Sequence, residues 1–165
     1  MKTLIVIDMQ NDFIDGSLGT AEAVEIVDRV REKIQAAHAA GQQIIFTRDT
    51  HHENYMDTNE GKHLPVVHCI EGTPGWEIRD GLYVEGATII DKPSFGYTGW
   101  GEYAFDEVEL VGLCTDICVV SNALILKALF PEIRVSVDPA CCAGVTPESH
   151  EAALKTMSMC QVEVE

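Results

Sequence analysis

The chain has 165 residues, 46% of them hydrophobic, which is typical of one globular domain covering residues 1–165. It has 27 Asp and Glu residues against 11 Lys and Arg, a formal net charge of -16 at pH 7. Because such a surface repels phosphate groups, we expect no nucleic acid and no anionic membrane surface as partners. No apolar stretch approaches the roughly 20 residues that span a bilayer. Acidic residues interrupt the N-terminal apolar run too early for a signal peptide, so we expect a cytoplasmic protein.

The cysteines of the chain are best explained as reduced thiols. The six stand at positions 69, 114, 118, 141, 142 and 160, and no signal sequence or pair of CxxC motifs accompanies them. A disulfide framework and a structural zinc knuckle are therefore not expected. Most of the six are interpreted as small buried side chains.

Strand-like and helix-like segments alternate along the chain. Apolar runs predict strands at 3–8, 43–49, 87–92, 106–113, 133–138 and, as a short last strand, 160–165. Helical spacing predicts a helix over 21–40, with Thr20 as its N-cap and Gly41 as its stop signal. Thr146 and Pro147 predict the start of another helix.

Two further segments stand out from this alternation. Residues 115–130 are apolar nearly all round, so we expect a deeply buried helix there. Residues 50–75 have no periodicity of their own, which is typical of a functional loop, and a short helix is expected to begin at Trp76.

The alternation predicts an α/β fold: a doubly wound, mainly parallel sheet of five or six strands with helices on both faces. Ligands bind such sheets at the carboxyl ends of the strands. The first three strands end in Asp8, Asp49 and Lys92, and the fourth runs into CTDIC, which contains Cys114 and Cys118. Acid, base and thiol are therefore expected at one edge of the sheet.

Of the two thiols at this edge, Cys118 is the better candidate nucleophile. It falls in the first turn of a predicted helix, where the backbone N–H groups and the helix dipole favour a thiolate. Asp8 is placed to accept its proton, and Lys92 to stabilise the resulting charges. Each of these residues alone is as readily explained by a structural role, but their convergence favours catalysis. Burial raises the pKa of a thiol, but we expect the helix terminus and the ammonium of Lys92 to outweigh it. The pKa of Cys118 is therefore expected to lie below the roughly 8.5 of a free cysteine.

Three segments, VIDMQNDF (6–13), IIDKPSFG (89–96) and VGLCTDICV (111–119), resemble the isochorismatase-like cysteine hydrolases, which include the nicotinamidases. The resemblance runs from about residue 3 to at least residue 145, with the segments in the order of the family. It implies that Asp8 is the general base, Lys92 the charge stabiliser and Cys118 the nucleophile.

The resemblance also implies a cis peptide between Leu113 and Cys114. The backbone N–H groups of Cys114 and Cys118 would then form an oxyanion hole. Isochorismatases proper cleave a vinyl ether and typically lack the nucleophilic cysteine. The presence of Cys118 thus favours an amidase-type enzyme.

Asp49 and His51 form an Asp-x-His pair that, with His68, offers carboxylate and imidazole ligands suited to zinc, and also to manganese or iron. The pair alone is a weak signal, because the loop also contains His52 and His63. Nicotinamidases bind a metal through such a pair and a later histidine before G-T-x-G, and HCIEGTPG supplies that context for His68. Glu60 lies where some members add a glutamate. The resemblance therefore implies one divalent metal, preferably zinc, at Asp49, His51, Glu60 and His68.

One departure concerns the substrate. Nicotinamidases commonly have an aromatic residue shortly before the metal-binding histidine, where this chain has Leu64, Pro65, Val66 and Val67. Phe13 remains as a substrate-binding wall. Aromatic residues after the lysine are further candidates: Tyr97, Trp100 and Tyr103. The missing ring weakens the case for nicotinamide itself but not for amide hydrolysis.

The leading hypothesis is a homo-oligomeric cysteine amidohydrolase that hydrolyses a small, nicotinamide-like carboxamide to the acid and ammonia through a thioester. One alternative is another amidase or carbamoyl-amide hydrolase of the same superfamily. Another is a catalytically silent binding domain on this fold. A redox pair of Cys114 and Cys118 is disfavoured by their spacing of four and the absence of CxxC.

Overall fold

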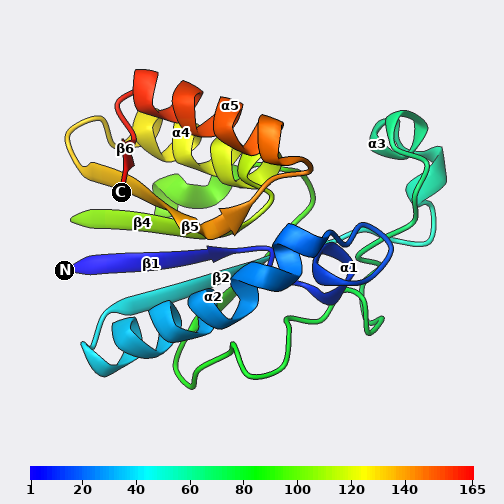
Figure 1. Cartoon of the computed structure of the whole chain (residues 1–165), viewed down its shortest axis with the longest axis horizontal. Helices are drawn as coiled ribbons and strands as arrows, with labels where there is room; N and C mark the ends of the chain where they lie inside the picture. The colour runs from blue at the N-terminus through cyan, green and yellow to red at the C-terminus, as the bar shows by residue number, and fades with distance from the viewer.

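The computed structural model describes residues 1–165 and is built around one six-stranded sheet. All neighbouring strands are parallel, in the order β3-β2-β1-β4-β5-β6 (Figure 1). The strands are β1 (Lys2–Ile7), β2 (Gln43–Asp49), β3 (Thr88–Lys92), β4 (Glu107–Leu113), β5 (Arg134–Ala143) and β6 (Glu163–Val164). The predicted parallel α/β sheet is confirmed.

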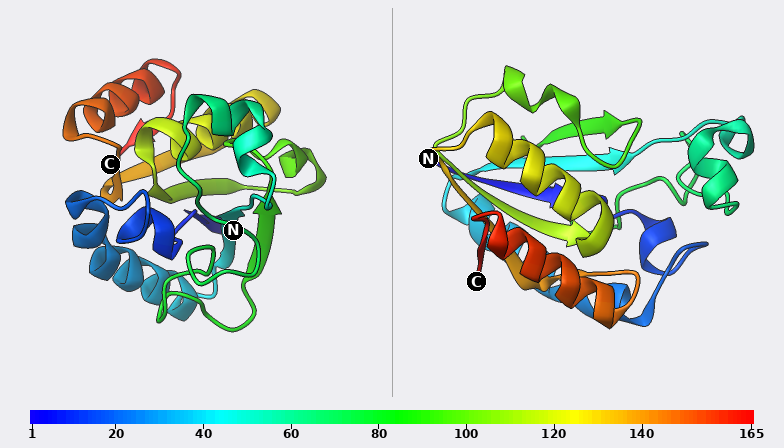
Figure 2. Two further views of the ribbon diagram at one scale, coloured as in Figure 1. Left: turned by 90° about the vertical axis from the view of Figure 1, so that its right-hand side faces the viewer. Right: turned by 90° about the horizontal axis from the view of Figure 1, so that it is seen from above.

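Helices cover both faces of this sheet. The helices on the faces are α2 (Ala21–Ala39), α4 (Val120–Leu129) and α5 (Pro147–Met159), whereas the short helices α1 (Asn11–Ile14) and α3 (Asn59–His63) lie beyond the carboxyl ends of the strands. Helix α2 lies on one face, and α4 and α5 lie side by side on the other (Figures 1 and 2). No helix combines the length and the hydropathy needed to cross a membrane.

Strand β1 shows why the strands read as continuous apolar runs. Leu4 and Val6 point into the core on the α2 side, whereas Ile5 and Ile7 point into the core beneath α4 and α5. All four are fully buried, because successive side chains of a strand face opposite sides and both sides are covered here.

The predicted helix boundaries rest on caps that the structure contains. The Thr20 side chain accepts a hydrogen bond from the N–H of Ala23, and Thr146 forms a capping box with Ser149 ahead of Pro147. Gly41, just after α2, has φ +70, a conformation that glycine adopts without steric cost. Both helices therefore begin where the sequence predicts.

The structure corrects the predicted helix at Trp76, which lies in a turn instead. The Trp76 indole N–H donates to Thr50 Oγ1, and the guanidinium of Arg48 lies 3.7 Å from the centre of its ring. These contacts hold the loop around Trp76 against the end of β2. The short helices of this region come earlier, at Tyr55–Asp57 and in α3, and Thr58 caps the latter through the N–H of Gly61.

Two other elements differ from the expectation. Strand β5 continues past residue 138 to Ala143, with a register shift opposite Leu110 and Gly112. The predicted helix over 115–130 starts as a π-helical turn at Thr115–Val119, before α4. Helix α4 is buried on one face only, and Leu129 on its other side is 45% exposed. The reason is that no layer covers the side of α4 that faces away from the sheet (Figure 2).

Gly112 permits the close approach of β4 to β1. It has φ +120 and pairs with Ile7, and a Cβ built at this position would lie 2.1 Å from the carbonyl oxygen of Ile7. We predict that Gly112→Ala lowers the free energy of unfolding by at least about 2 kcal/mol, because two backbone segments at the centre of the sheet must separate. Urea denaturation measures the change.

Gly101→Ala is the matched control, since its added Cβ would meet only a Leu129 methyl group at 3.9 Å. We expect that variant to lie within about 0.5 kcal/mol of the parent protein. Equal stabilities of the two variants would contradict this interpretation of Gly112.

Candidate active site

Three side chains of the predicted catalytic set meet at the carboxyl edge of the sheet. Asp8 follows β1, Lys92 ends β3, and Cys118 lies in the π-helical turn before α4. The Lys92 Nζ atom is 2.7 Å from Asp8 Oδ2 and 3.5 Å from Cys118 Sγ. Asp8 and Lys92 are fully buried and Cys118 nearly so. The structure thus brings together the acid, the base and the thiol.

Asp8 is held in position by Thr47 of β2, which sequence analysis did not identify. The Thr47 hydroxyl donates to Asp8 Oδ1 at 2.7 Å, and the Asp8 N–H donates to the carbonyl and the hydroxyl oxygen of Thr47, each at 3.2 Å. Asp8 itself has φ +47, which turns the chain sharply away from the strand. One carboxylate oxygen is therefore fixed by Thr47, while the other faces Lys92.

Burial dominates the protonation of these groups. It raises the pKa of the Asp8 carboxyl above its usual value, against the opposing charge of Lys92. It also raises the pKa of the Cys118 thiol well above its usual value, and the negative charge of Asp8 adds to this effect. The expectation of an unusually acidic Cys118 is therefore wrong, because the sulfur is enclosed rather than exposed at a helix terminus. A neutral thiol in contact with a carboxylate needs that carboxylate to remove its proton.

Lys92 keeps its charge in this environment. Burial lowers the pKa of Lys92, but the negative charges of Asp8, Cys118 and Asp49 outweigh this effect and raise the pKa above its usual value. The ammonium group thus lies as a fixed positive charge beside the thiol.

Cys114 lies at the start of the same turn. The peptide bond between Leu113 and Cys114 is cis, as the resemblance implies. Cys114 is half-buried, lines the same cavity as Cys118, and forms no disulfide with it. Burial raises the pKa of its thiol to about 12, so this sulfur is a poor nucleophile near neutrality.

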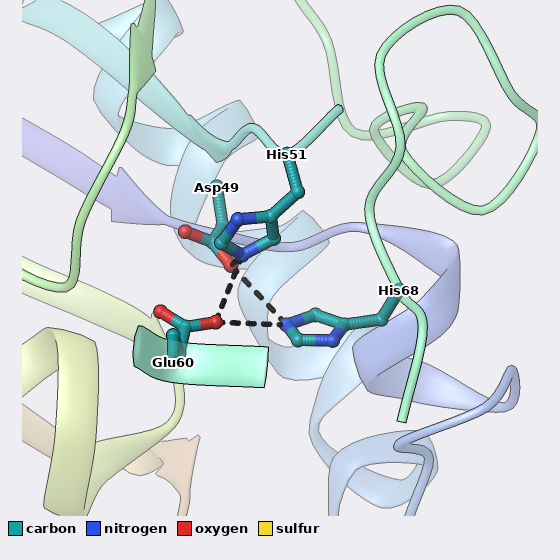
Figure 3. A group of neighbouring side chains, drawn as sticks. All are labelled: Asp49, His51, Glu60 and His68. Atoms are coloured by element: carbon teal, nitrogen blue, oxygen red, sulfur yellow. Dashed lines mark hydrogen bonds and ion pairs between the residues drawn. The ribbon is translucent and has the colours of Figure 1, made fainter. Parts of the chain in front are cut away.

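The four residues predicted as metal ligands form one cluster (Figure 3). Their potential ligand atoms all lie within 4.8 Å of one another. His51 Nε2 is 2.9 Å from Asp49 Oδ2 and 3.1 Å from Glu60 Oε2, and His68 Nε2 is 3.5 Å and 3.7 Å from the same two atoms. Asp49 ends β2, His51 follows it, Glu60 comes from α3, and His68 from the loop beyond. The other two histidines of the loop, His52 and His63, are exposed and lie outside the cluster.

The cluster has the properties of a cation site. Asp49 Oδ1 is buried without a hydrogen-bond partner, and the buried Glu60 Oε2 has only the imidazole rings of His51 and His68 beside it. His68 Nδ1 is 2.7 Å from the carbonyl oxygen of Val66, which leaves Nε2 free to face the carboxylates. Burial lowers the pKa of His51, but the neighbouring carboxylates of Asp49 and Glu60 outweigh this effect and raise the pKa to about 9. Two carboxylates and two imidazoles of this kind match the ligands of zinc, manganese or iron.

Gln10 fixes the backbone of Asp49, and sequence analysis also missed it. Its side-chain NH₂ donates to the carbonyl oxygens of Asp49 and Trp76, each at 2.9 Å, and its Oε1 accepts from the Asp49 N–H at 2.8 Å. In the same segment, Asp12 accepts from the N–H of Cys69, next to His68. Gln10 and Asp12 are polar residues shortly after a buried strand, and this position is the pattern by which the sequence could have identified them.

A cavity of about 170 Å³ opens above the thiol. Cys114 and Cys118 lie in its wall beside Asp49, Glu60 and His68. Phe13 lines it as predicted, with its ring centre 5.5 Å from that of His68. The aromatic residues considered after the lysine do not line it: Tyr97, Trp100 and Tyr103 belong to the core beneath α4. Phe95, from the same segment, lines the cavity instead.

Comparison with known proteins agrees with this architecture. Residues 2–165 match the family model described as the isochorismatase domain. The chain is 29% identical to the nicotinamidase/pyrazinamidase of Mycobacterium tuberculosis, over 99% of this chain and 98% of that protein. It is 28% identical to the ureidoacrylate amidohydrolase of Acinetobacter baylyi, over 92% of this chain and 74% of that protein.

Among solved structures, the pyrazinamidase of Pyrococcus horikoshii in complex with zinc superposes with a TM-score of 0.87. It is 30% identical and the match covers 99% of this chain and 98% of that one. With a family model that spans nearly its whole length, this chain belongs to the isochorismatase family.

Proposed function

We propose that this protein is a metal-assisted cysteine amidohydrolase that converts a small, nicotinamide-like carboxamide into the acid and ammonia. The observation that carries the proposal is the contact of Cys118 and Asp8 with the ammonium of Lys92, at a cavity beside a cation site. The names of the relatives, which include nicotinamidases, support amide hydrolysis. We further propose that residues 1–165 act as a single hydrolase domain. Cytoplasmic location and homo-oligomeric assembly stay predictions.

In the proposed first step, the Cys118 sulfur attacks the amide carbonyl carbon. Because burial keeps the thiol neutral, Asp8 takes the proton as the sulfur–carbon bond forms. The raised pKa of Asp8 makes it a stronger base than an exposed carboxylate. Lys92 stabilises the negative charge that passes between sulfur and carboxylate.

The tetrahedral intermediate places a negative charge on the former carbonyl oxygen. We assign its stabilisation to the backbone N–H groups of Cys114 and Cys118. Asp8 returns the proton to the nitrogen as the carbon–nitrogen bond breaks, so that ammonia leaves and a thioester remains on Cys118. Asp8 then removes a proton from water as the water oxygen attacks the thioester carbon. When the carbon–sulfur bond breaks, Asp8 returns this proton to the sulfur, so that the acid leaves and the thiol and carboxylate are restored.

The cation site would be filled by one divalent metal, with Asp49, His51, Glu60 and His68 as its ligands. Zinc suits this mixed set best, and manganese or iron also fits. When bound, the metal supplies a Lewis-acidic charge that orients a ring nitrogen of the substrate, or water, at the cavity wall.

Two alternative functions are weaker. A carbamoyl-amide hydrolase would use the same residues, and the ureidoacrylate amidohydrolase relative supports it. A silent binding domain would have no use for a buried thiol, carboxylate and ammonium in mutual contact.

We predict that the two thiols of the turn differ in their importance. Cys118→Ala should lower kcat for ammonia release from nicotinamide by at least about 1000-fold, because it removes the nucleophile. Cys114→Ala should stay within about tenfold of the parent enzyme, because alanine keeps the backbone N–H. A folded, metal-loaded Cys114→Ala protein without activity would contradict these assignments.

We also predict one bound divalent metal per chain, measured by elemental analysis after incubation with zinc. His51→Ala and His68→Ala should each lose most of this metal, because each removes an imidazole ligand. His63→Ala is the matched control, since that exposed ring lies against the carbonyl oxygen of Asn59 within α3. A chelator should abolish activity, and zinc should restore it. A parent protein that stays metal-free, or equal metal content in all variants, would argue against the site.

A further inference from the structure

We infer that the preferred substrates are neutral carboxamides that carry an apolar group on the side opposite the amide, and that amides bearing a carboxylate are poor substrates. This inference rests on the proposed function and defines the substrate class of the same site. It depends on a set of cavity residues that we call the apolar collar: Leu18, Leu64, Phe95, Ile117 and Val145.

The collar is formed by segments far apart in the chain. Its members come from the loop before α2, the end of α3, the segment after β3, the π-helical turn and the segment before α5. The remaining lining residues are Phe13, Thr20, the two cysteines and three residues of the cation site, Asp49, Glu60 and His68. The hydroxyl oxygen of Thr20, also in the wall, already caps α2. Apart from the thiols and the cation site, the wall of the cavity is therefore almost entirely apolar.

The outer members of the collar leave apolar surface open around the mouth of the cavity. Leu64 is 37% exposed, Phe95 42% and Val145 50%. Single exposed apolar side chains are ordinary on protein surfaces. Here, however, all three line the same cavity as the nucleophile, so a molecule bound in the cavity would cover part of their apolar surface.

The position of Cys118 determines what that molecule is. An amide whose carbonyl carbon reaches Sγ must place the rest of its structure along the cavity wall. Apart from the cation site, Thr20 and the cysteines, every residue of that wall is apolar, so a substituent that does not bind at the cation site contacts the collar or Phe13. An apolar group of the substrate therefore fits the collar.

The charges of the site disfavour an acidic substituent. No Lys or Arg side chain lines the cavity. Lys92 is fully buried behind it and paired with Asp8. The two carboxylates of the cation site, Asp49 and Glu60, offset the charge of a divalent metal. A carboxylate placed at the collar would lose its hydration without gaining a counter-charge, and the net charge of -16 would slow its approach.

The test compares kcat/KM for ammonia release across acetamide, butyramide, hexanamide, isocaproamide and succinamate, with nicotinamide as reference. Each methylene that the collar buries should raise kcat/KM about fourfold. Isocaproamide and succinamate have the same branched shape, but the isopropyl end of one is a carboxylate in the other. We expect kcat/KM for isocaproamide to exceed that for succinamate at least about tenfold, because the carboxylate would lose its hydration without gaining a counter-charge.

Leu64→Arg places a cation at the collar and should reverse this preference. We expect it to raise kcat/KM for succinamate at least about tenfold and to lower that for hexanamide. Leu129→Arg is the matched control, because Leu129 is 45% exposed on α4 and does not line the cavity. It should leave both values unchanged, which separates a local charge effect from a change in net charge.

The outcomes separate the two proposals. If no amide, including nicotinamide, releases ammonia from the metal-loaded protein, the proposed function fails. If amides are hydrolysed but succinamate equals isocaproamide, or if Leu64→Arg and Leu129→Arg act alike, amide hydrolysis stands and the apolar collar does not select the substrate.

Discussion

The ammonium group of Lys92 is the charge on which the site depends. It is fully buried, 2.7 Å from Asp8, 3.7 Å from Asp49 and 3.5 Å from the Cys118 sulfur. A buried charge is tolerated only with partners, and two buried carboxylates beside each other would repel without a cation. Strand order β3-β2-β1 makes this arrangement possible, because parallel neighbours place Lys92, Asp49 and Asp8 at one edge of the sheet.

Asp49 joins the thiol centre to the cation site. One of its carboxylate oxygens faces Lys92, and the other lies 2.9 Å from His51. Gln10 fixes its backbone from the segment that follows Asp8, so β1 positions residues of both centres. The two sites are therefore one connected group of buried charges, in which displacement of Asp49 would disturb both.

The sequence predicted those features that follow from periodicity and strand ends. Asp8, Asp49 and Lys92 could be placed at one edge because buried parallel strands have a recognisable pattern. Glu60 and His68 could be assigned only through the family resemblance, because loop packing, not periodicity, sets their positions. The roles of these residues in catalysis and metal binding stay predictions.

Other features depended on packing that no local pattern reveals. The raised pKa of Cys118 follows from complete enclosure of the sulfur, whereas the sequence indicated only its place near a helix start. The sequence does not distinguish Trp100 from a residue of the cavity wall. In the structure its indole N–H donates a hydrogen bond to Asn122 in the core. Phe95, which is five residues before Trp100 and three residues after the end of β3, lines the cavity instead.

Detection of the acyl-enzyme would test the role of Cys118 most directly. The metal-loaded protein would be mixed with saturating nicotinamide, quenched with acid during turnover, digested, and examined by mass spectrometry. A nicotinoyl group should be found as a thioester on the peptide that contains Cys118, and on the sulfur of that residue rather than Cys114. Ammonia release with the acyl group on another cysteine, or on none, would contradict Cys118 as the nucleophile.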